Sequence, residues 1–325
     1  MEEAAPIDPH ARLDAILAAE RFDALEAERR RRLRQCGWVA GVAAAALLLL
    51  VLSDPMNAML LGLPVLGLAA GAFWLLNREY GRAARKALMP AVCRAIGDIE
   101  HRTGAQGAPL AQLRAARMLA DWSKEDVDDV FEGIWRQTLF LLAEADLKMV
   151  RGSGKNSSSR TVFKGLVFFI ETPKPIAPQI LLRARRPPLL GPRRPRRREL
   201  GKLERAAVPH DGFSRRFEMW SNYPPAALEV VTPAFAELMA HLSATAGWLG
   251  LDAAFTRTHL ILALPRSGDR FAVGSLLRPA ARLGDDAHRA LDEVLAAHRL
   301  IDLLHDGPAP QKEAQARLVE IPTDR

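Results

Sequence analysis

Two long runs without a charged side chain lie near the start of the chain. They cover residues 35–53 and 55–77, and Asp54 is the only charged residue between them. Helices of about 19 and about 22 residues are roughly 28 and 33 Å long, enough to cross the apolar core of a bilayer. Neither run has a polar face, which argues against a hairpin buried inside a soluble domain. The pattern predicts a transmembrane helical hairpin over residues 35–77, with helices at about 36–53 and 56–76.

A secretory signal peptide is the alternative interpretation of the first run. Such a signal has a short basic start and a small-residue cleavage site of the A-x-A type. Here 34 residues precede the run, and no A-x-A pattern leads into Asp54. We therefore keep the hairpin as the prediction.

Basic residues flank the hairpin at both ends. They are Arg29, Arg30, Arg31, Arg32 and Arg34 upstream, and Arg78, Arg82, Arg85 and Lys86 downstream. The connecting turn holds Asp54 and no basic residue. Because loops rich in Lys and Arg stay in the cytoplasm, we expect both chain ends on the cytoplasmic side.

The segments on either side of the hairpin have helical periodicity. In residues 1–34, Asp8-Pro9 is a typical helix start, and the apolar spacing that follows predicts an amphipathic helix running into the membrane. Residues 78–134 are predicted to be a juxtamembrane helical region, with a kink at Pro90 and a second helix at about 108–122. Ser123 and Asp126 resemble a capping box that begins one more turn.

From residue 135 the period changes to two, which is typical of strands. The face predicted to be buried holds Leu139, Leu141, Ala143, Ala145, Leu147 and Met149. The opposite face holds Glu144, Asp146 and Lys148, which we expect to meet solvent. Further strands at 162–171 and 179–185 complete an expected antiparallel meander.

The later residues alternate between strands and helices. Residues 213–220 read as a strand, Thr232-Pro233 opens a helix that Gly247 closes, and 251–255 with 259–264 read as a hairpin, followed by an edge at 271–273. We predict an α+β fold over residues 135–282, with a mainly antiparallel sheet packed by helices. A C-terminal helix and a polar tail are expected over 283–325.

Three short motifs after the hairpin occur in a recognisable order. They are Phe163-Lys164-Gly165-Leu166, Phe213-Ser214-Arg215-Arg216-Phe217-Glu218-Met219-Trp220-Ser221 and Thr232-Pro233-Ala234-Phe235. Together with the hairpin, over residues 35–279, they resemble the bacterial membrane-anchored family of domains of unknown function numbered 3137. That family has no established activity, cofactor or catalytic residue. The resemblance implies an inner-membrane anchor with a cytoplasmic domain, and supplies no mechanism.

Charge and cysteine content narrow the class of protein further. The net charge is +7 and the sequence pI is about 9.8, but the excess lies mainly beside the hairpin and in one loop. The two cysteines, Cys36 and Cys93, are far apart, so a disulfide framework and a C-x-x-C metal or redox motif are excluded.

An arginine-rich loop over residues 183–205 is the most marked polar feature. Its candidates for contact with an anionic surface are Arg183, Arg185, Arg186, Arg193, Arg194, Arg196, Arg197, Arg198 and Lys202. A membrane anchor would hold this loop near acidic lipids. A solvated loop and an acidic protein partner remain open. Nucleic acid is disfavoured because the loop has no aromatic residue for base stacking.

Three patterns resemble catalytic or metal sites. Gly152-Ser153-Gly154-Lys155-Asn156-Ser157 lacks the first glycine and the helix of a phosphate loop, and a hairpin loop is the better interpretation. His298, Asp302 and His305 share one helix face, but a solvated face is preferred over a metal site because no fourth ligand is evident. Glu144 and Asp146 are interpreted as charges on a solvent-facing strand rather than as acid–base catalysts.

The sequence therefore predicts a membrane-anchored cytoplasmic interaction or membrane-sensing protein rather than an enzyme. We expect the bilayer and a protein as partners, and no cofactor, metal or nucleic acid. A tethered regulatory domain that binds a small ligand, in a pocket between the sheet and the helix at 233–246, is the first alternative. An enzyme with an unrecognised site is the second.

Overall fold

The computed structural model describes residues 8–19, 22–53, 55–104, 108–152, 157–185, 202–245, 250–266 and 268–306. The chain divides into two compact units, each built from separated stretches of sequence. Unit 1 comprises Met1–Gly97 and Phe271–Leu291, and unit 2 comprises Asp98–Arg270 and Asp292–Arg325. We describe each unit by itself.

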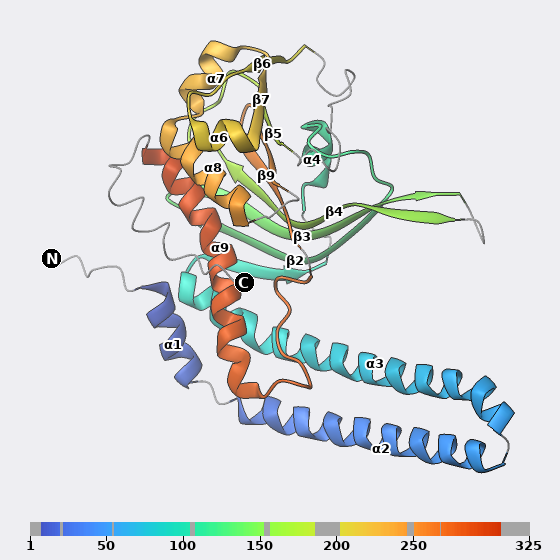
Figure 1. Cartoon of the computed structure of the whole chain (residues 1–325). Helices are drawn as coiled ribbons and strands as arrows, with labels where there is room; N and C mark the ends of the chain where they lie inside the picture. Colours follow the sequence, from blue (N-terminus) through green and yellow to red (C-terminus); the bar gives the residue numbers. More distant parts are fainter. Residues whose placement is uncertain are drawn as a thin grey trace. The chain divides into compact units, whose positions relative to one another are not determined.

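Unit 1 is helical. It contains α1 (Pro9–Ala19), α2 (Asp23–Ser53), α3 (Pro55–Ile96), the short 3-10 turn η4 (Ala280–Arg282) and the beginning of α9 (Leu283–Asp306). The long helices α2 and α3 run antiparallel and side by side (Figure 1). The expected single N-terminal helix is wrong, because α1 ends at Ala19 and α2 begins at Asp23, where Asp23 and Glu26 place negative charge in the first turn.

A tight core joins α1 to the second half of α3 in unit 1. The side chains of Leu13 on α1 and of Tyr80, Leu88 and Val92 on α3 are fully buried. Pro90 lies inside α3 and does not end the helix. A long helix can continue past an internal proline, which bends it. The core thus joins α1 to the polar half of α3.

Unit 2 is built on one antiparallel sheet. Its strands are β1 (Ile99–Thr103), β2 (Lys124–Trp135), β3 (Thr138–Arg151), β4 (Ser158–Glu171), β5 (Ile180–Ala184), β6 (Glu204–Ala206), β7 (Phe217–Ser221), β8 (Asp252–Phe255) and β9 (His259–Pro265). In the described residues they lie in the order β1-β2-β3-β4-β9-β8-β5-β7-β6. The predicted α+β class with an antiparallel sheet is confirmed.

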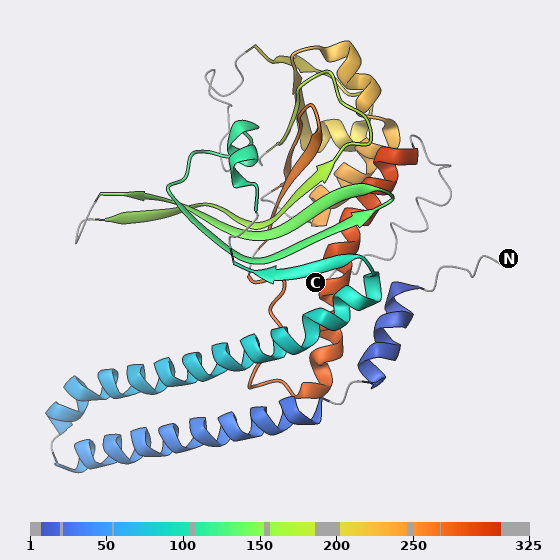
Figure 2. The same ribbon diagram turned by 180° about the vertical axis from the view of Figure 1, so that it is seen from behind.

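Helices cover both faces of this sheet (Figures 1 and 2). On one side lie α6 (Asp211–Arg216), α7 (Pro224–Val230), α8 (Pro233–Thr245) and the end of α9, and on the other lies α4 (Leu110–Ala115). The start of α8 is as predicted, since the Thr232 hydroxyl accepts a hydrogen bond from the Phe235 backbone N–H. Two apolar layers therefore form, one on each side of the strands.

Several predicted elements differ from the structure. The helical prediction for region 78–134 holds as far as Ile96, where α3 ends. The rest of the region contains β1, the short helix α4 and most of β2, which replaces the turn expected at Ser123. The expected meander holds for β3 and β4, which pair antiparallel, whereas β5 lies between β8 and β7. The strand expected from Phe213 begins at Phe217, because the His210 imidazole caps α6 by accepting the Phe213 N–H. Residues 271–273 form no strand.

The central strand β3 is buried on both faces. Leu141, Ala143 and Ala145 lie in the core on the α4 side, as predicted, but Leu139 is exposed. Glu144 was expected to face solvent and is 5% exposed instead. The alternation of apolar and polar residues predicts a sheet with one buried face and one solvated face. Helices also cover the second face, so both faces of the sheet are buried.

Candidate functional site

The surface of the α2–α3 hairpin is apolar over most of its length. Its exposed large apolar side chains are Trp38, Val42, Leu48, Leu49, Val51, Leu52, Leu61, Leu63, Leu66, Leu68, Trp74 and Leu75. Leu52 and Leu63 are 74% and 76% exposed. Both helices are long and apolar enough, by length and composition, to cross a membrane. An apolar surface of this extent needs a cover other than water.

The basic residues predicted to set the topology gather at the base of the hairpin. Arg30, Arg31, Arg34, Arg78, Arg82 and Lys86 are exposed, and Arg29, Arg32 and Arg85 are half-buried. Arg32 forms ion pairs with Glu28 at 2.7 Å and Glu79 at 2.6 Å, and so joins α2 to α3. The Arg78 guanidinium lies over the Trp74 ring, 5.3 Å from its centroid. An indole and a cation paired in this way are typical of a membrane–water boundary.

Glu26 is the centre of a second group of contacts at this base. Its carboxylate accepts hydrogen bonds from the guanidinium groups of Arg29 at 2.8 Å and Arg30 at 2.9 Å. It also accepts the backbone N–H of Ala280 at 3.2 Å. The hydrogen bonds from Arg29, Arg30 and the Ala280 amide hold the pKa of Glu26 far below its ordinary range. Glu26 therefore ties the segment before α9 to the hairpin.

The arginine-rich loop is only partly described. Arg186, Arg193, Arg194, Arg196, Arg197 and Arg198 lie outside the described residues. Arg185 and Lys202 are exposed, but Arg183 is 4% exposed and donates to the Arg117 carbonyl oxygen at 2.7 Å. The prediction that Arg183 contacts an anionic surface is wrong, because its guanidinium is buried in unit 2.

The helix face of His298, Asp302 and His305 is not the solvated face that the sequence favoured. The imidazole of His298 is 6% exposed and lies against Trp135, whose indole N–H donates to Asp302 at 2.9 Å. His305 Nε2 lies 2.7 Å from the Thr138 hydroxyl. The three side chains each contact the β2–β3 turn, so their common face is an intramolecular contact.

An ionic cluster joins β3, the loop after β9 and α9 inside unit 2. Both Glu144 carboxylate oxygens accept the Arg270 backbone N–H, at 3.1 and 3.2 Å. The Arg270 guanidinium pairs with Glu293 at 2.6 Å. Glu293 is buried, whereas the Arg270 side chain is one third exposed. Glu144 thus has a structural partner that the sequence pattern did not reveal.

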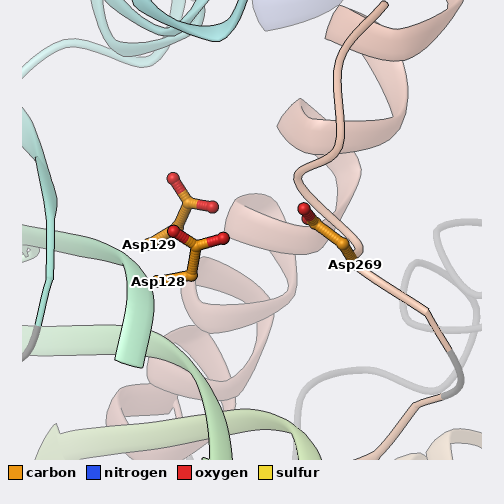
Figure 3. A group of neighbouring side chains, drawn as sticks. All are labelled: Asp128, Asp129 and Asp269. Carbon is orange, nitrogen blue, oxygen red and sulfur yellow. The ribbon is translucent and has the colours of Figure 1, made fainter. Parts of the chain in front are cut away.

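Three aspartates of unit 2 converge beside this cluster (Figure 3). Asp128 and Asp129 come from β2, and Asp269 from the loop after β9, with carboxylate oxygens within 4.8 Å of one another. Neighbours on a regular strand point to opposite faces, but the register of β2 on β3 shifts between Val127 and Val130. Such oxygens are the ligand type of Mg²⁺ or Ca²⁺. Asp129 is fully buried and already contacts His101 Nε2 at 2.6 Å.

In unit 1, two histidines that are 278 residues apart come together. The Nδ1 atoms of His10 and His288 lie 3.0 Å apart. The ring planes differ by 8° and the centroids are 5.2 Å apart, so the two nitrogens point at each other along the line of centres. The Asp14 carboxylate lies 2.8 Å from His288 Nε2. An N–H of one ring therefore donates to the other ring, and the trio fastens α1 to α9.

Phe235, Leu238 and Met239 of α8 are buried in the core. An open pocket of about 520 Å³ lies beside α4. It is lined by Ala108, Leu110, Ala111, Arg114, Ala115 and Glu125. Its lining brings one cation and one carboxylate together, 3.6 Å apart.

Comparison with known proteins gives a family. Residues 161–305 match the family described as "Protein of unknown function (DUF3137)". No curated protein matches the chain. Among solved structures, the crystal structure of the mycobacterial trehalose monomycolate transport factor A, TtfA, covers 71% of this chain and 98% of its own, with 12% identity and a TM-score of 0.34. A similarity at that level supports no inference about this chain.

Proposed function

The chain belongs, through residues 161–305, to the DUF3137 family, and from that premise we propose that it is a membrane-anchored interaction protein. Its helices α2 and α3 cross the bacterial inner membrane as a hairpin. Both chain ends and unit 2 lie on the cytoplasmic side. Unit 2 then acts by binding a protein partner at the membrane surface.

The observation that carries the anchor is the exposed apolar surface of α2 and α3. None of the most apolar stretch of α2, and 6% of that of α3, is buried by the rest of the chain. Removing one large apolar side chain from water gains about 1.5–3 kcal/mol, so a dozen such side chains strongly favour a lipid environment. The exposed basic residues at the hairpin base favour a cytoplasmic location for that base.

Fractionation and cysteine labelling test the anchor. We expect the full chain to remain in the membrane pellet after a carbonate wash, and release into the supernatant would contradict the anchor. For sidedness, Ser53→Cys and Asp285→Cys are made in a chain with Cys36 and Cys93 replaced. An impermeant maleimide should label position 53 in intact spheroplasts and position 285 only after permeabilisation. The reverse pattern would overturn the orientation.

An exposed apolar patch on unit 2 favours a protein partner. Ile134, Trp135 and Leu139, at the β2–β3 turn, are 52%, 36% and 45% exposed. Trp135 is also the type of residue that most often dominates a protein interface. Arg136 and Gln137 form the two-residue loop between these strands and both have positive φ, as a type I′ hairpin turn requires.

Site-specific photo-crosslinking in native membranes tests the patch. A photoreactive residue at Ile134 should give one discrete adduct, and the adduct should disappear when Leu139→Asp is added. The same residue at Lys124, an exposed position at the far end of β2, is the matched control. Equal adducts from both positions, or none from either, would count against a partner at this surface.

A further inference from the structure

A segment of unit 1 from a distant part of the sequence is fastened to the base of the hairpin. We call residues 271–282 the strap; they run beside α3 and lead into α9 (Figures 1 and 2). The Asn77 side-chain oxygen accepts the Leu276 backbone N–H at 2.9 Å and the Ser275 hydroxyl at 3.2 Å. Arg29 on α2 donates to the Leu276 carbonyl oxygen at 3.0 Å. Both helices of the hairpin therefore bind the same residue of the strap.

The strap is built to hold this conformation. Gly274 has φ +71°, and a side chain there would meet the Ala84 methyl at 3.0 Å and the Tyr80 ring at 3.1 Å. The Gly274 N–H donates to Asp286 at 3.0 Å, and Asp286 is 5% exposed. Close packing on α3 and a buried acceptor thus fix the path of the strap before it reaches Leu276.

Asn77 sets the depth of the strap relative to the apolar part of the hairpin. It is the last residue of the uncharged run 55–77, and Arg78 follows it. A residue at the end of such a run lies at the level of the lipid headgroups. Because Leu276 is hydrogen-bonded to Asn77, residues 275–278 lie at that same level.

At this level the strap presents a large apolar side chain outward. Leu276 is fully buried, whereas its neighbour Leu277 is 73% exposed. The strap also carries Arg278 and Arg282, whose side chains are 50% and 66% exposed. Arg278 pairs with Asp286 at 3.2 Å and Arg282 pairs with Asp285 at 3.1 Å. A leucine among cations is the pattern of segments that insert shallowly into the boundary of an anionic bilayer.

We propose that the strap is a third membrane contact of this protein. Leu277 enters the headgroup region of the cytoplasmic leaflet, and Arg278 and Arg282 face the phosphates of anionic lipids. This proposal rests on the proposed function only in that the hairpin must span the bilayer. The strap contact differs from the anchor in chemistry, because its strength should depend on the content of acidic lipid and on the salt concentration.

An environment-sensitive fluorophore on single cysteines tests the proposal in the full chain. The cysteine-replaced chain receives Leu277→Cys, Leu63→Cys or Asp14→Cys, is labelled with NBD and is reconstituted into vesicles. The vesicles contain phosphatidylcholine alone or with phosphatidylglycerol. Leu63 reports the spanning helix, and Asp14, whose side chain is 68% exposed on α1, reports water. We expect blue-shifted emission at 277 in anionic vesicles, with quenching by a shallow spin-labelled lipid exceeding that by a deep one.

The outcomes separate the strap from the anchor. The label at 63 could be quenched by the deep spin-labelled lipid while the label at 277 emits as in water in both kinds of vesicle. This result would overturn the strap contact and leave the anchor intact. A water-like label at 63 would overturn both. Asn77→Ala provides a second variant, since it removes the acceptor that holds Leu276. It should return the emission at 277 toward that at 14 while leaving that at 63 unchanged, and an unaltered emission at 277 would show that Asn77 does not set the depth.

Discussion

The indole ring of Trp135 stacks on the imidazole ring of His298, with centroids 4.2 Å apart and planes 9° apart. Phe140 meets the same imidazole edge-on at 5.4 Å. Among the described residues, His298 Nε2 has no hydrogen-bond partner. Burial between these rings lowers the pKa of His298 to about 4, against a weaker opposing effect of Asp302.

The stability of the fold should therefore fall as pH drops below neutral. In the unfolded chain His298 takes up a proton near pH 6.5, whereas the folded chain resists protonation until about pH 4. The unfolded state binds more protons within that window, so stability decreases as pH falls through it and levels off below it. The predicted loss from this residue is about 3 kcal/mol. Thermal midpoints of the full chain in detergent, at pH 7.5 and pH 4.5, measure it.

His298→Phe is the variant that isolates this effect. Phenylalanine keeps the stack on Trp135 and does not titrate, so the difference between the two midpoints should shrink. A difference as large as that of the unchanged chain would show that other groups account for the acid sensitivity.

The β2–β3 turn offers a stabilising substitution. Arg136 and Gln137 have φ values of +48° and +62°, the signs required by a type I′ turn, which favours Asn and Gly. A left-handed residue with a side chain costs about 1–2 kcal/mol, so Gln137→Gly should stabilise by about 0.5–1 kcal/mol after the entropic cost of glycine. Gln112→Gly, in the helix α4, is the matched control and should destabilise by about 1 kcal/mol. If both substitutions changed the stability in the same direction, backbone strain at Gln137 would be refuted.

Gly165, in the first of the recognised motifs, should not tolerate a side chain. Its φ is +150°, and a Cβ would lie 2.3 Å from the Leu264 carbonyl oxygen and 2.6 Å from the Arg266 nitrogen. Backbone atoms of β9 cannot move aside, so Gly165→Ala should destabilise by more than about 3 kcal/mol or prevent folding. Gly284→Ala, where the nearest atom is 3.9 Å away, is the control and should be neutral. Expression yield and thermal midpoint report both.

The buried cluster around Glu144 predicts a contrast between two glutamates. Glu144→Ala removes both oxygens that accept the Arg270 N–H in a site 5% exposed, and should cost about 1–3 kcal/mol. Glu132→Ala removes an ion pair with Arg102 whose side chains are nearly half exposed, and should change stability by less than about 1 kcal/mol. Denaturation of the two variants under the same conditions gives the comparison. Similar losses would mean that Glu144 behaves as a surface residue.

The sequence predicted the elements whose signal is local. The charge-free helices, the Thr232 cap of α8 and the β8–β9 hairpin each depend on residues close in the chain. The helical prediction for 78–134 holds through the end of α3 at Ile96 and fails at β2. This strand carries acidic residues at its exposed start, and its apolar residues begin only at Val127. Strand pairing with β1 and β3 overrides that weak local pattern.

The candidate sites were less predictable because their contacts are between distant residues. His10 and His288 looked scattered in the sequence, and no spacing rule joins positions so far apart. Asp128 and Asp129 read as two charges on opposite faces until the bulge brings their oxygens near Asp269. Glu144 follows a polar alternation, yet the helices that cover its face come from residues after 210. The periodicity of a strand predicts on which face of the sheet a residue lies. It does not predict which elements cover that face.

The long separation between the strap and the hairpin has a consequence for how the protein is made. Asn77 and Leu276 are 199 residues apart. At roughly 5–20 residues per second, translation delivers the strap about 10–40 seconds after the hairpin leaves the ribosome. In the proposed anchor, the two helices would therefore enter the bilayer and persist there on their own apolar surface. The strap would then close on an anchor already in place, as a late step of biogenesis.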